Sequence, residues 1–215
     1  MDWKRLIPAF MAYAVSLAFH ESAHAWTAWK LGDPTGRIEG RITLNPIPHI
    51  DPFGTILLPL MLWWSTNGQV MFGYAKPVRY NPYALRNGPI GSSMVAGAGP
   101  ASNFLLAGIA ALVLAFLVKT GAAHFEIGET FLVSLVTVNV YLALFNLLPF
   151  PPLDGGTVVS GLLPRGLARA YGAIEPYGFV ILIVLMATHV LNPLLYGAHD
   201  AIVGPLLRFA GFPRE

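Results

Sequence analysis

One apolar segment, residues 7–31, sets the strongest limit on what this chain can fold into. As a helix rising 1.5 Å per residue it would be about 37 Å long, which is enough to cross a bilayer. The segment nevertheless contains three ionisable side chains, His20, Glu21 and His24. Because such side chains cost several kcal/mol in lipid unless they are paired or bound, we expect them to face a partner inside the protein.

The composition of the whole chain also indicates a membrane protein. Hydrophobic residues make up 55% of the chain and charged residues only 11%, against roughly 25% charged residues in an average soluble domain. The net charge of +2 is small and the basic residues are not clustered, which argues against a nucleic-acid partner. Cysteine is absent, so histidine, aspartate or glutamate must supply the ligands of any metal.

We predict an all-α polytopic membrane protein with a single domain over residues 1–215. Long apolar segments predict helices at residues 7–31, 90–118, 130–148 and 173–191. A polar interruption inside residues 53–74 favours a re-entrant segment over a full crossing, and residues 201–212 form a short final segment. The alternation of apolar and polar residues at 37–44 predicts a short membrane-associated β-hairpin.

The first apolar helix contains an H-E-x-x-H motif, formed by His20, Glu21 and His24. Two histidines four positions apart lie on one helical face, so that both imidazoles can reach a single zinc ion. Glu21 lies beside them as a base for water. On a soluble helix the same spacing is often structural, but three ionisable residues in an apolar segment favour a metal site.

A second group of functional residues follows the helix at 130–148, in the sequence N-L-L-P-F-P-P-L-D-G-G that runs from Asn146 to Gly156. Its prolines break the helix at membrane depth, where irregular backbone is tolerated only if protein shields it or a polar cavity adjoins it. Asp154 is placed to supply a carboxylate, which would complete a ligand set of two histidines and one carboxylate. Two alternatives remain open: Asp154 caps the next helix, or His49 and Asp51 supply the metal ligands in its place.

Three motifs in this order resemble the site-2 protease family of intramembrane zinc metalloproteases: the H-E-x-x-H motif, the sequence A-G-P-A-S-N that ends at Asn103, and the segment from Asn146 to Gly156. The resemblance covers about residues 19–163. It implies an enzyme that cuts transmembrane segments of other membrane proteins. It also implies a form without the PDZ or CBS domains of many relatives.

The resemblance further implies a role for each residue of the site. His20, His24 and Asp154 would bind one zinc ion per chain, and Glu21 would act as general base. Asn146 would position the substrate or stabilise the oxyanion.

The basic residues predict an orientation in the membrane. Eight of them flank the inner helix ends that we propose: Lys30, Arg37, Arg41, Lys76, Arg79, Arg86, Arg165 and Arg169. The positive-inside rule then puts the ends of the helices at 7–31 and 130–148 in the cytoplasm. We expect a multi-pass protein of the bacterial inner membrane with its active site towards the cytoplasm. Its partners would be the lipid bilayer and a membrane-protein substrate, captured along the strand at 37–44.

Two other functions stay open on the sequence: a chaperone-like protein of the same fold that binds without cutting, and a metal or proton transporter. The remaining polar and aromatic residues have simpler explanations. We expect interhelical hydrogen bonds from Asn103 and Asn139, and an interfacial aromatic belt from Trp29, Trp63 and Trp64. His124, His189 and His199 are interpreted as structural.

Overall fold

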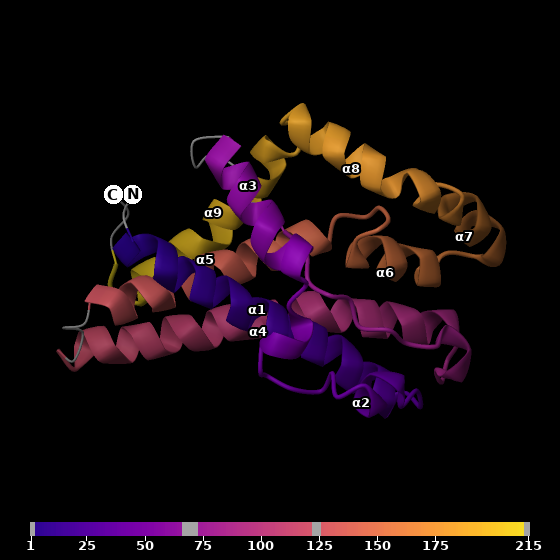
Figure 1. Cartoon of the computed structure of the whole chain (residues 1–215), viewed down its shortest axis with the longest axis horizontal. Helices are drawn as coiled ribbons and strands as arrows, with labels where there is room; N and C mark the ends of the chain where they lie inside the picture. The colour runs from indigo at the N-terminus through magenta and orange to yellow at the C-terminus, as the bar shows by residue number, and fades with distance from the viewer. Residues whose placement is uncertain (1–2, 66–72, 122–125, 213–215) are drawn as a thin grey trace.

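The computed structural model describes residues 3–65, 73–121 and 126–212, and all regular structure in these ranges is helical. The long helices are α1 (Trp3–Lys30), α4 (Pro89–Lys119), α5 (Glu126–Asn146) and α9 (Asn192–Phe209) (Figure 1). The shorter ones are α2 (Thr35–Ile38), α3 (Leu58–Ser65), α6 (Asp154–Leu162), α7 (Arg165–Gly172) and α8 (Gly178–Ala187). Single turns of other helix types are η1 (Ile47–His49), η2 (Pro52–Leu57), η3 (Pro82–Ala84) and η4 (Glu175–Tyr177).

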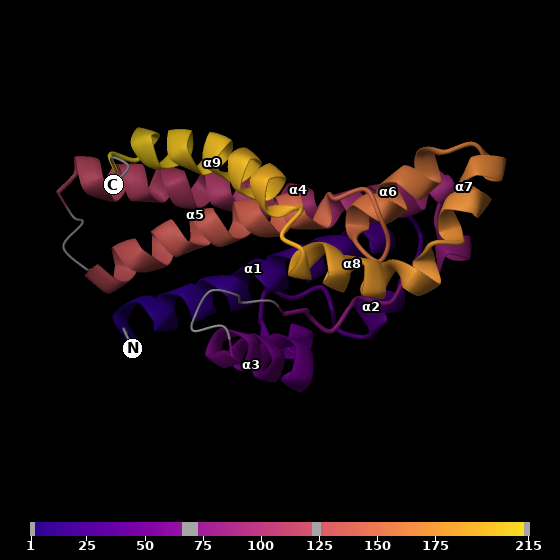
Figure 2. The same cartoon turned by 90° about the horizontal axis from the view of Figure 1, so that it is seen from above.

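Helices α1, α4 and α5 pack against one another, and α9 lies along α4 and α5 (Figure 2). Small side chains fill the centre of this bundle, with Ala12, Ala107 and Ala110 next to Val136 and Val140. Alanine lets helix backbones approach closely, which is how helices associate in lipid. The bundle is therefore tight enough to hold side chains from different helices in fixed relative positions.

Four helical stretches are long and apolar enough to cross a membrane: Trp3–Lys30, Pro89–Lys119, Ile127–Asn146 and Arg165–Ala187. The first three agree with predicted helices. Their outer faces are apolar, as Leu105, Leu112 and Phe116 on α4 are each more than half exposed. Apolar side chains in such numbers on the outside of a bundle are expected where lipid covers it.

The predicted β-hairpin at residues 37–44 is wrong. Helix α2 takes up the start of that segment, and the rest of it is irregular. Asp33 starts the helical turn by accepting hydrogen bonds from the backbone and the hydroxyl of Thr35. The Ser22 hydroxyl bonds both the N–H and the C=O of Thr43. A side chain from α1 therefore uses backbone groups that a strand partner would have needed.

The C-terminal helices also differ from the prediction. The helix expected at 173–191 is shorter, because η4 with Pro176 precedes α8, which ends at Ala187. The segment expected at 201–212 belongs to a longer helix, α9, which begins at Asn192 and packs into the bundle through Val203. Pro193 lies in the first turn of α9. At that position the N–H that proline lacks would have no partner within the helix, so the proline starts a helix instead of ending one.

Residues 53–74 form η2 and α3 before the chain leaves the described part at residues 66–72. The two ends of the segment meet, because the N–H of Tyr74 donates to the Gly54 carbonyl at 3.0 Å. The Thr55 hydroxyl also donates to the Tyr74 carbonyl at 2.8 Å. How far the segment enters the membrane between these ends stays a prediction.

Candidate metal centre

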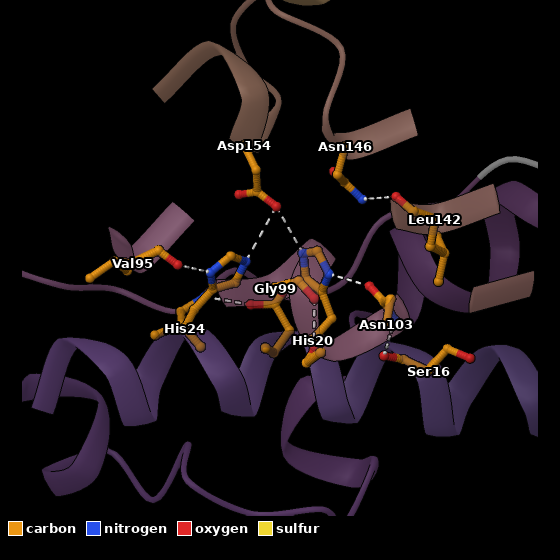
Figure 3. A network of polar contacts seen from close by, with 12 residues as sticks. Ser16, His20, His24, Val95, Gly99, Asn103, Leu142, Asn146 and Asp154 are labelled. Carbon is orange, nitrogen blue, oxygen red and sulfur yellow. Dashed lines mark hydrogen bonds and ion pairs between the residues drawn. The ribbon is translucent and has the colours of Figure 1, made fainter. Parts of the chain in front are cut away.

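His20 and His24 lie one turn apart on the inner face of α1, with their ring planes almost perpendicular and their centroids 4.6 Å apart. Both point the same ring atom at one carboxylate from a distant part of the chain (Figure 3). The Nε2 atom of His20 is 3.0 Å from Oδ2 of Asp154, and that of His24 is 3.4 Å away. The structure therefore brings together the three residues that the sequence predicts as metal ligands.

Asp154 reaches the histidines through the break after α5. The chain leaves the helix at Asn146, and α6 begins at Asp154 itself, with Leu153 before it as the N-terminal flanking residue. No side chain caps this helix, so the alternative in which Asp154 serves as a cap is wrong. A Cβ atom at Gly155 would lie 2.4 Å from the carbonyl oxygens of Leu147 and Leu148. The glycine is thus needed for close approach, which holds the start of α6 against the preceding loop.

The far nitrogen of each imidazole is bonded to a carbonyl oxygen. Nδ1 of His20 is 2.6 Å from Oδ1 of Asn103, and Nδ1 of His24 is 2.7 Å from the Val95 carbonyl. Because both partners are acceptors, each Nδ1 carries a hydrogen, so in the neutral imidazoles each Nε2 has the lone pair. Asn103 is held with its oxygen towards His20, since its amide group donates to the Ser16 carbonyl and to Asn139.

These contacts leave three electron-rich atoms facing one another in a buried place. Besides the two Nε2 atoms there is Oδ2 of Asp154, a buried oxygen that receives no hydrogen bond from the residues that the structure describes. The ligand atoms of His20, His24 and Asp154 all lie within 4.8 Å of one another. A single proton would reduce the repulsion between only two of these atoms at a time, whereas a metal ion would bind all three. Two imidazoles and one carboxylate form a donor set that suits a zinc ion with one open position.

Gly99 on α4 provides the space in which the two rings sit. A Cβ atom there would lie 2.5 Å from Cε1 and Nε2 of His24 and 2.6 Å from Cε1 of His20. No real side chain tolerates such distances. Gly99, the second residue of the A-G-P-A-S-N motif, therefore belongs to the site as much as the ligands do.

Glu21 is buried next to His20 on α1, and one of its carboxylate oxygens accepts a hydrogen bond from the N–H of Val78 at 2.9 Å. This bond ties α1 to the irregular stretch after residue 73. It restrains the carboxylate without adding a second charge. The sequence offered no sign of this partner, since a backbone N–H carries no signature in the residue type.

Asn146 is near the cluster but does not contact it. Its amide Nδ2 donates to the Leu142 carbonyl one turn earlier in α5, at 3.0 Å (Figure 3). An amide nitrogen has two hydrogens, and this bond uses one of them. The second hydrogen remains available to a group in the adjacent cavity, which Asn146 helps to line.

The three candidate ligands, His20, His24 and Asp154, line a cavity of about 680 Å³ whose walls are mostly apolar. Its lining comes from α1, α4, α5, α6, α8 and α9, from Pro59 of α3 and from the stretch at 73–80. His199 of α9, interpreted from the sequence as structural, lines this cavity and meets the ring of Tyr141 edge-on at 6.4 Å. Its place near the end of an apolar segment gave no hint of this position.

The other candidate ligands have different roles. Asp51 caps η2 by accepting hydrogen bonds from Phe53 and Gly54, and Nε2 of His49 bonds the Thr43 carbonyl. Neither joins the metal-ligand group found among the described residues, so the alternative pair of ligands is wrong. His189 bonds the nearby Asn192 outside the cavity, while His124 lies outside the described residues.

Comparison with known proteins also points to a zinc metalloprotease. The model of peptidase family M50 matches residues 117–187, a range that includes Asp154. The "Putative zinc metalloprotease YwhC" of Bacillus subtilis is 39% identical over 197 residues, which cover 88% of this chain and 86% of that protein. The "Putative zinc metalloprotease Rip2" of Mycolicibacterium smegmatis is 32% identical over 180 residues, covering 84% and 66%. Its namesake from Mycobacterium tuberculosis H37Rv is 32% identical over 187 residues, covering 86% and 68%. No solved structure matches the chain.

Proposed function

The chain belongs to the site-2 proteases, peptidase family M50, and on that premise we propose that it hydrolyses peptide bonds in or near transmembrane segments of other membrane proteins. It is a metalloprotease and an integral membrane protein. The observation that carries this proposal is the convergence of Nε2 of His20 and Nε2 of His24 on the buried carboxylate oxygen of Asp154.

His20, His24 and Asp154 would hold one zinc ion per chain. Zinc bound by such a set acts as a Lewis acid, which activates water and polarises the carbonyl to be cut. The hydrogen bonds from Nδ1 of both histidines to carbonyl oxygens select the neutral tautomer whose Nε2 can bind a metal, and they fix the direction of each ring. The fixed rings lower the cost of bringing the three ligands together.

Glu21 would take the proton from the attacking water and pass it to the leaving amine. The Val78 N–H holds one of its oxygens. The other oxygen has no hydrogen bond to the described residues, which leaves it able to exchange the proton. Asn146 would donate its second amide hydrogen to the oxyanion or to the substrate backbone, a contact worth about 3–4 kcal/mol when it acts on the transition state in a dry site.

The substrate would bind as an extended chain along the stretch at residues 73–78. The N–H groups of Tyr74, Lys76 and Val78 are all bonded, to Gly54, to His49 and to Glu21 respectively. In an extended chain, the N–H groups of every second residue point to the same side. The bonded N–H groups of Tyr74, Lys76 and Val78 therefore form one paired edge.

Ala75 would form the open edge of this stretch. Its N–H and C=O have no hydrogen-bond partner in the described part of the chain, and the residue lines the cavity. A substrate helix must unwind before its carbonyls can be attacked, and an unwound segment could pair with this edge. Ala75 thus replaces the strand at 37–44 as the capture site.

We further propose that the protein lies in a bacterial inner membrane, with the end of α1 and the metal site towards the cytoplasm. Basic residues concentrate at that end of the helices, and the relatives named above are bacterial. A re-entrant segment at 53–74 fits this orientation, because the bond from Tyr74 to Gly54 returns the chain to its starting point. Cysteine labelling at Arg79 and Lys119 in intact cells would test it, with Arg79 protected and Lys119 accessible from outside.

The function is tested by comparing the purified wild type with Glu21→Gln, using a model transmembrane substrate and metal analysis. We expect Glu21→Gln to keep its zinc and to cleave about 100-fold to 10,000-fold more slowly, because only the proton acceptor is lost. Glu175→Gln, at an exposed glutamate in η4, serves as the matched control and should cleave like the wild type. Cleavage by Glu21→Gln at the wild-type rate would overturn the mechanism.

The same experiment separates the two other functions. A chaperone-like protein would bind the substrate and leave it intact, even in the zinc-loaded wild type. A transporter would move metal or protons in vesicles and would keep doing so in Glu21→Gln.

A further inference from the structure

A second stripe of residues runs along α1, separate from the one that bears the histidines. Phe19, Ala23, Trp26 and Lys30 are spaced by three or four positions, so they share one face of the helix. His20 and His24 are about 100° further round the helix axis. This stripe takes no part in the metal site.

The stripe forms the floor of an open groove of about 340 Å³. Phe19, Ala23 and Trp26 line it from α1, and Ile42 and Leu44 line it from the irregular segment after α2. Its lining is almost entirely apolar. Trp26 and Leu44 are each at least half exposed, so apolar surface remains uncovered here.

Two cations are fixed at one end of this groove. Nζ of Lys30 lies 4.5 Å from the centre of the Trp29 ring and 5.6 Å from that of Trp26, which lines the groove. The guanidinium carbon of Arg37, on α2, lies 4.4 Å from the Trp29 ring. Within the described residues, neither cation forms a salt bridge with a carboxylate. The tryptophan rings hold both side chains in place while leaving their charge unneutralised.

The groove and the cations beyond it together span about one lipid leaflet. The groove-lining residues of α1, Phe19 to Trp26, rise about 10 Å, and Lys30 lies about 6 Å further along the helix axis, while half of a bilayer's hydrocarbon core is about 15 Å. An apolar groove followed by positive charge at the end where α1 leaves the apolar segment matches an acyl chain below a negatively charged headgroup. An apolar protein helix in the groove would give these two cations no anionic partner, whereas a phosphate would.

We propose that this groove binds one anionic phospholipid, with an acyl chain along Phe19, Ala23 and Trp26 and its phosphate at Lys30 and Arg37. Ser22 of α1 and Thr43 both line this groove and are hydrogen-bonded to each other, so a bound lipid would also hold the segment after α2 against α1. Lipid binding in this groove requires neither zinc nor substrate, so it can be tested independently of the proposed function.

Native mass spectrometry of the delipidated full-length protein tests the proposal, with palmitoyl-oleoyl phosphatidylglycerol and phosphatidylcholine as probes. We expect one phosphatidylglycerol to bind at concentrations that give no bound phosphatidylcholine. Lys30→Gln and Arg37→Gln should each weaken binding about fivefold, as expected for one basic residue near an anionic lipid. Ala23→Leu, which fills the groove and keeps both cations, should also weaken it.

The matched control is Lys119→Gln, since Nζ of Lys119 lies 5.7 Å from the Phe209 ring at the far end of α4 and does not adjoin this groove. It should bind phosphatidylglycerol like the wild type. Equal binding of the two lipids, or an equal loss in Lys119→Gln, would overturn the proposal. It would also fail if Ala23→Leu bound normally, or if a second copy of the chain occupied the groove and excluded lipid. Thermal unfolding of each variant checks that it is folded.

Discussion

Oδ1 of Asn103 on α4 lies 2.6 Å from Nδ1 of His20 on α1, and both residues are buried. This hydrogen bond links two of the three sequence motifs. It explains why the asparagine stands where α4 meets α1. Asn139 and Ser16 complete the network by bonding each other, and Asn103 bonds both of these residues. The interhelical hydrogen bond that the sequence predicts for Asn103 is therefore also the bond that supports the metal ligand His20.

Asn103→Leu should weaken zinc binding about 10-fold to 100-fold, because His20 would lose the acceptor that fixes its ring and its protonated nitrogen. Zinc affinity measured by competition with a chelator tests this. Asn103→Asp, which retains an oxygen acceptor, should recover part of the loss. Ser102→Ala is the control, since among the described residues the Ser102 hydroxyl bonds only the Gly99 carbonyl of its own helix. Equal affinity in Asn103→Leu and Ser102→Ala would show that Asn103 does not position His20.

Gly99→Ala should abolish stoichiometric zinc binding. The added methyl group would lie 2.5 Å from the ring of His24 and must push the imidazoles apart. Gly108→Ala is the matched control on the same helix, because a Cβ there meets nothing within 4 Å. It should keep its zinc and gain up to about 1 kcal/mol of helix stability. Full zinc occupancy in Gly99→Ala would contradict the close approach of α4 to the two rings.

Ala75→Pro should slow cleavage while leaving the zinc content unchanged. Proline removes the N–H of residue 75, which we propose as the donor to an extended substrate. Ala75→Gly keeps that N–H and should cleave at close to the wild-type rate, which separates loss of the donor from loss of the methyl group. Cleavage rates of the two variants on one model substrate are compared. Equal rates would exclude pairing at this edge.

Asp33 should stabilise the protein in a pH-dependent way. Burial raises the pKa of Asp33, but hydrogen bonds from Thr35 and from the Asn81 N–H lower it by more, so the pKa lies below its ordinary value. A lowered pKa in the folded state means that the stabilisation is complete above the unfolded pKa of about 4. It is lost as the pH falls through the folded value.

Asp33→Asn should therefore lower the free energy of unfolding at pH 7 by about 1–3 kcal/mol, the range for hydrogen bonds to a charged group. Below about pH 4 the difference from the wild type should narrow. Thermal unfolding in detergent at several pH values measures this, with the exposed Glu175→Gln as control. A difference that widened towards low pH would contradict the assigned direction of the pKa shift.

The sequence predicts well what depends on one segment at a time. Apolar runs identify α1, α4 and α5, and the spacing of His20 and His24 fixes their common face. Asp154 was predictable as well. Three nearby prolines exclude a continuous helix, and a lone carboxylate at membrane depth needs a partner.

The features that escaped prediction depend on contacts between distant segments. The alternation at 37–44 looks like a strand until Ser22 bonds Thr43 from another segment. The bond from Val78 to Glu21 uses a backbone N–H, which every residue except proline offers. Pro193 gives the same signal whether it ends one helix or begins the next. In the first two cases the deciding partner lies elsewhere in the sequence.

The central claim is that His20, His24 and Asp154 bind one zinc ion. Zinc-edge X-ray absorption, with metal analysis of the purified protein, tests it most directly. We predict about one zinc per chain, with two imidazole nitrogens and at least one oxygen at about 2.0–2.2 Å, and loss of that zinc in Asp154→Ala but not in Asp51→Ala. A protein without stoichiometric zinc, or an unchanged spectrum in Asp154→Ala, would contradict the account.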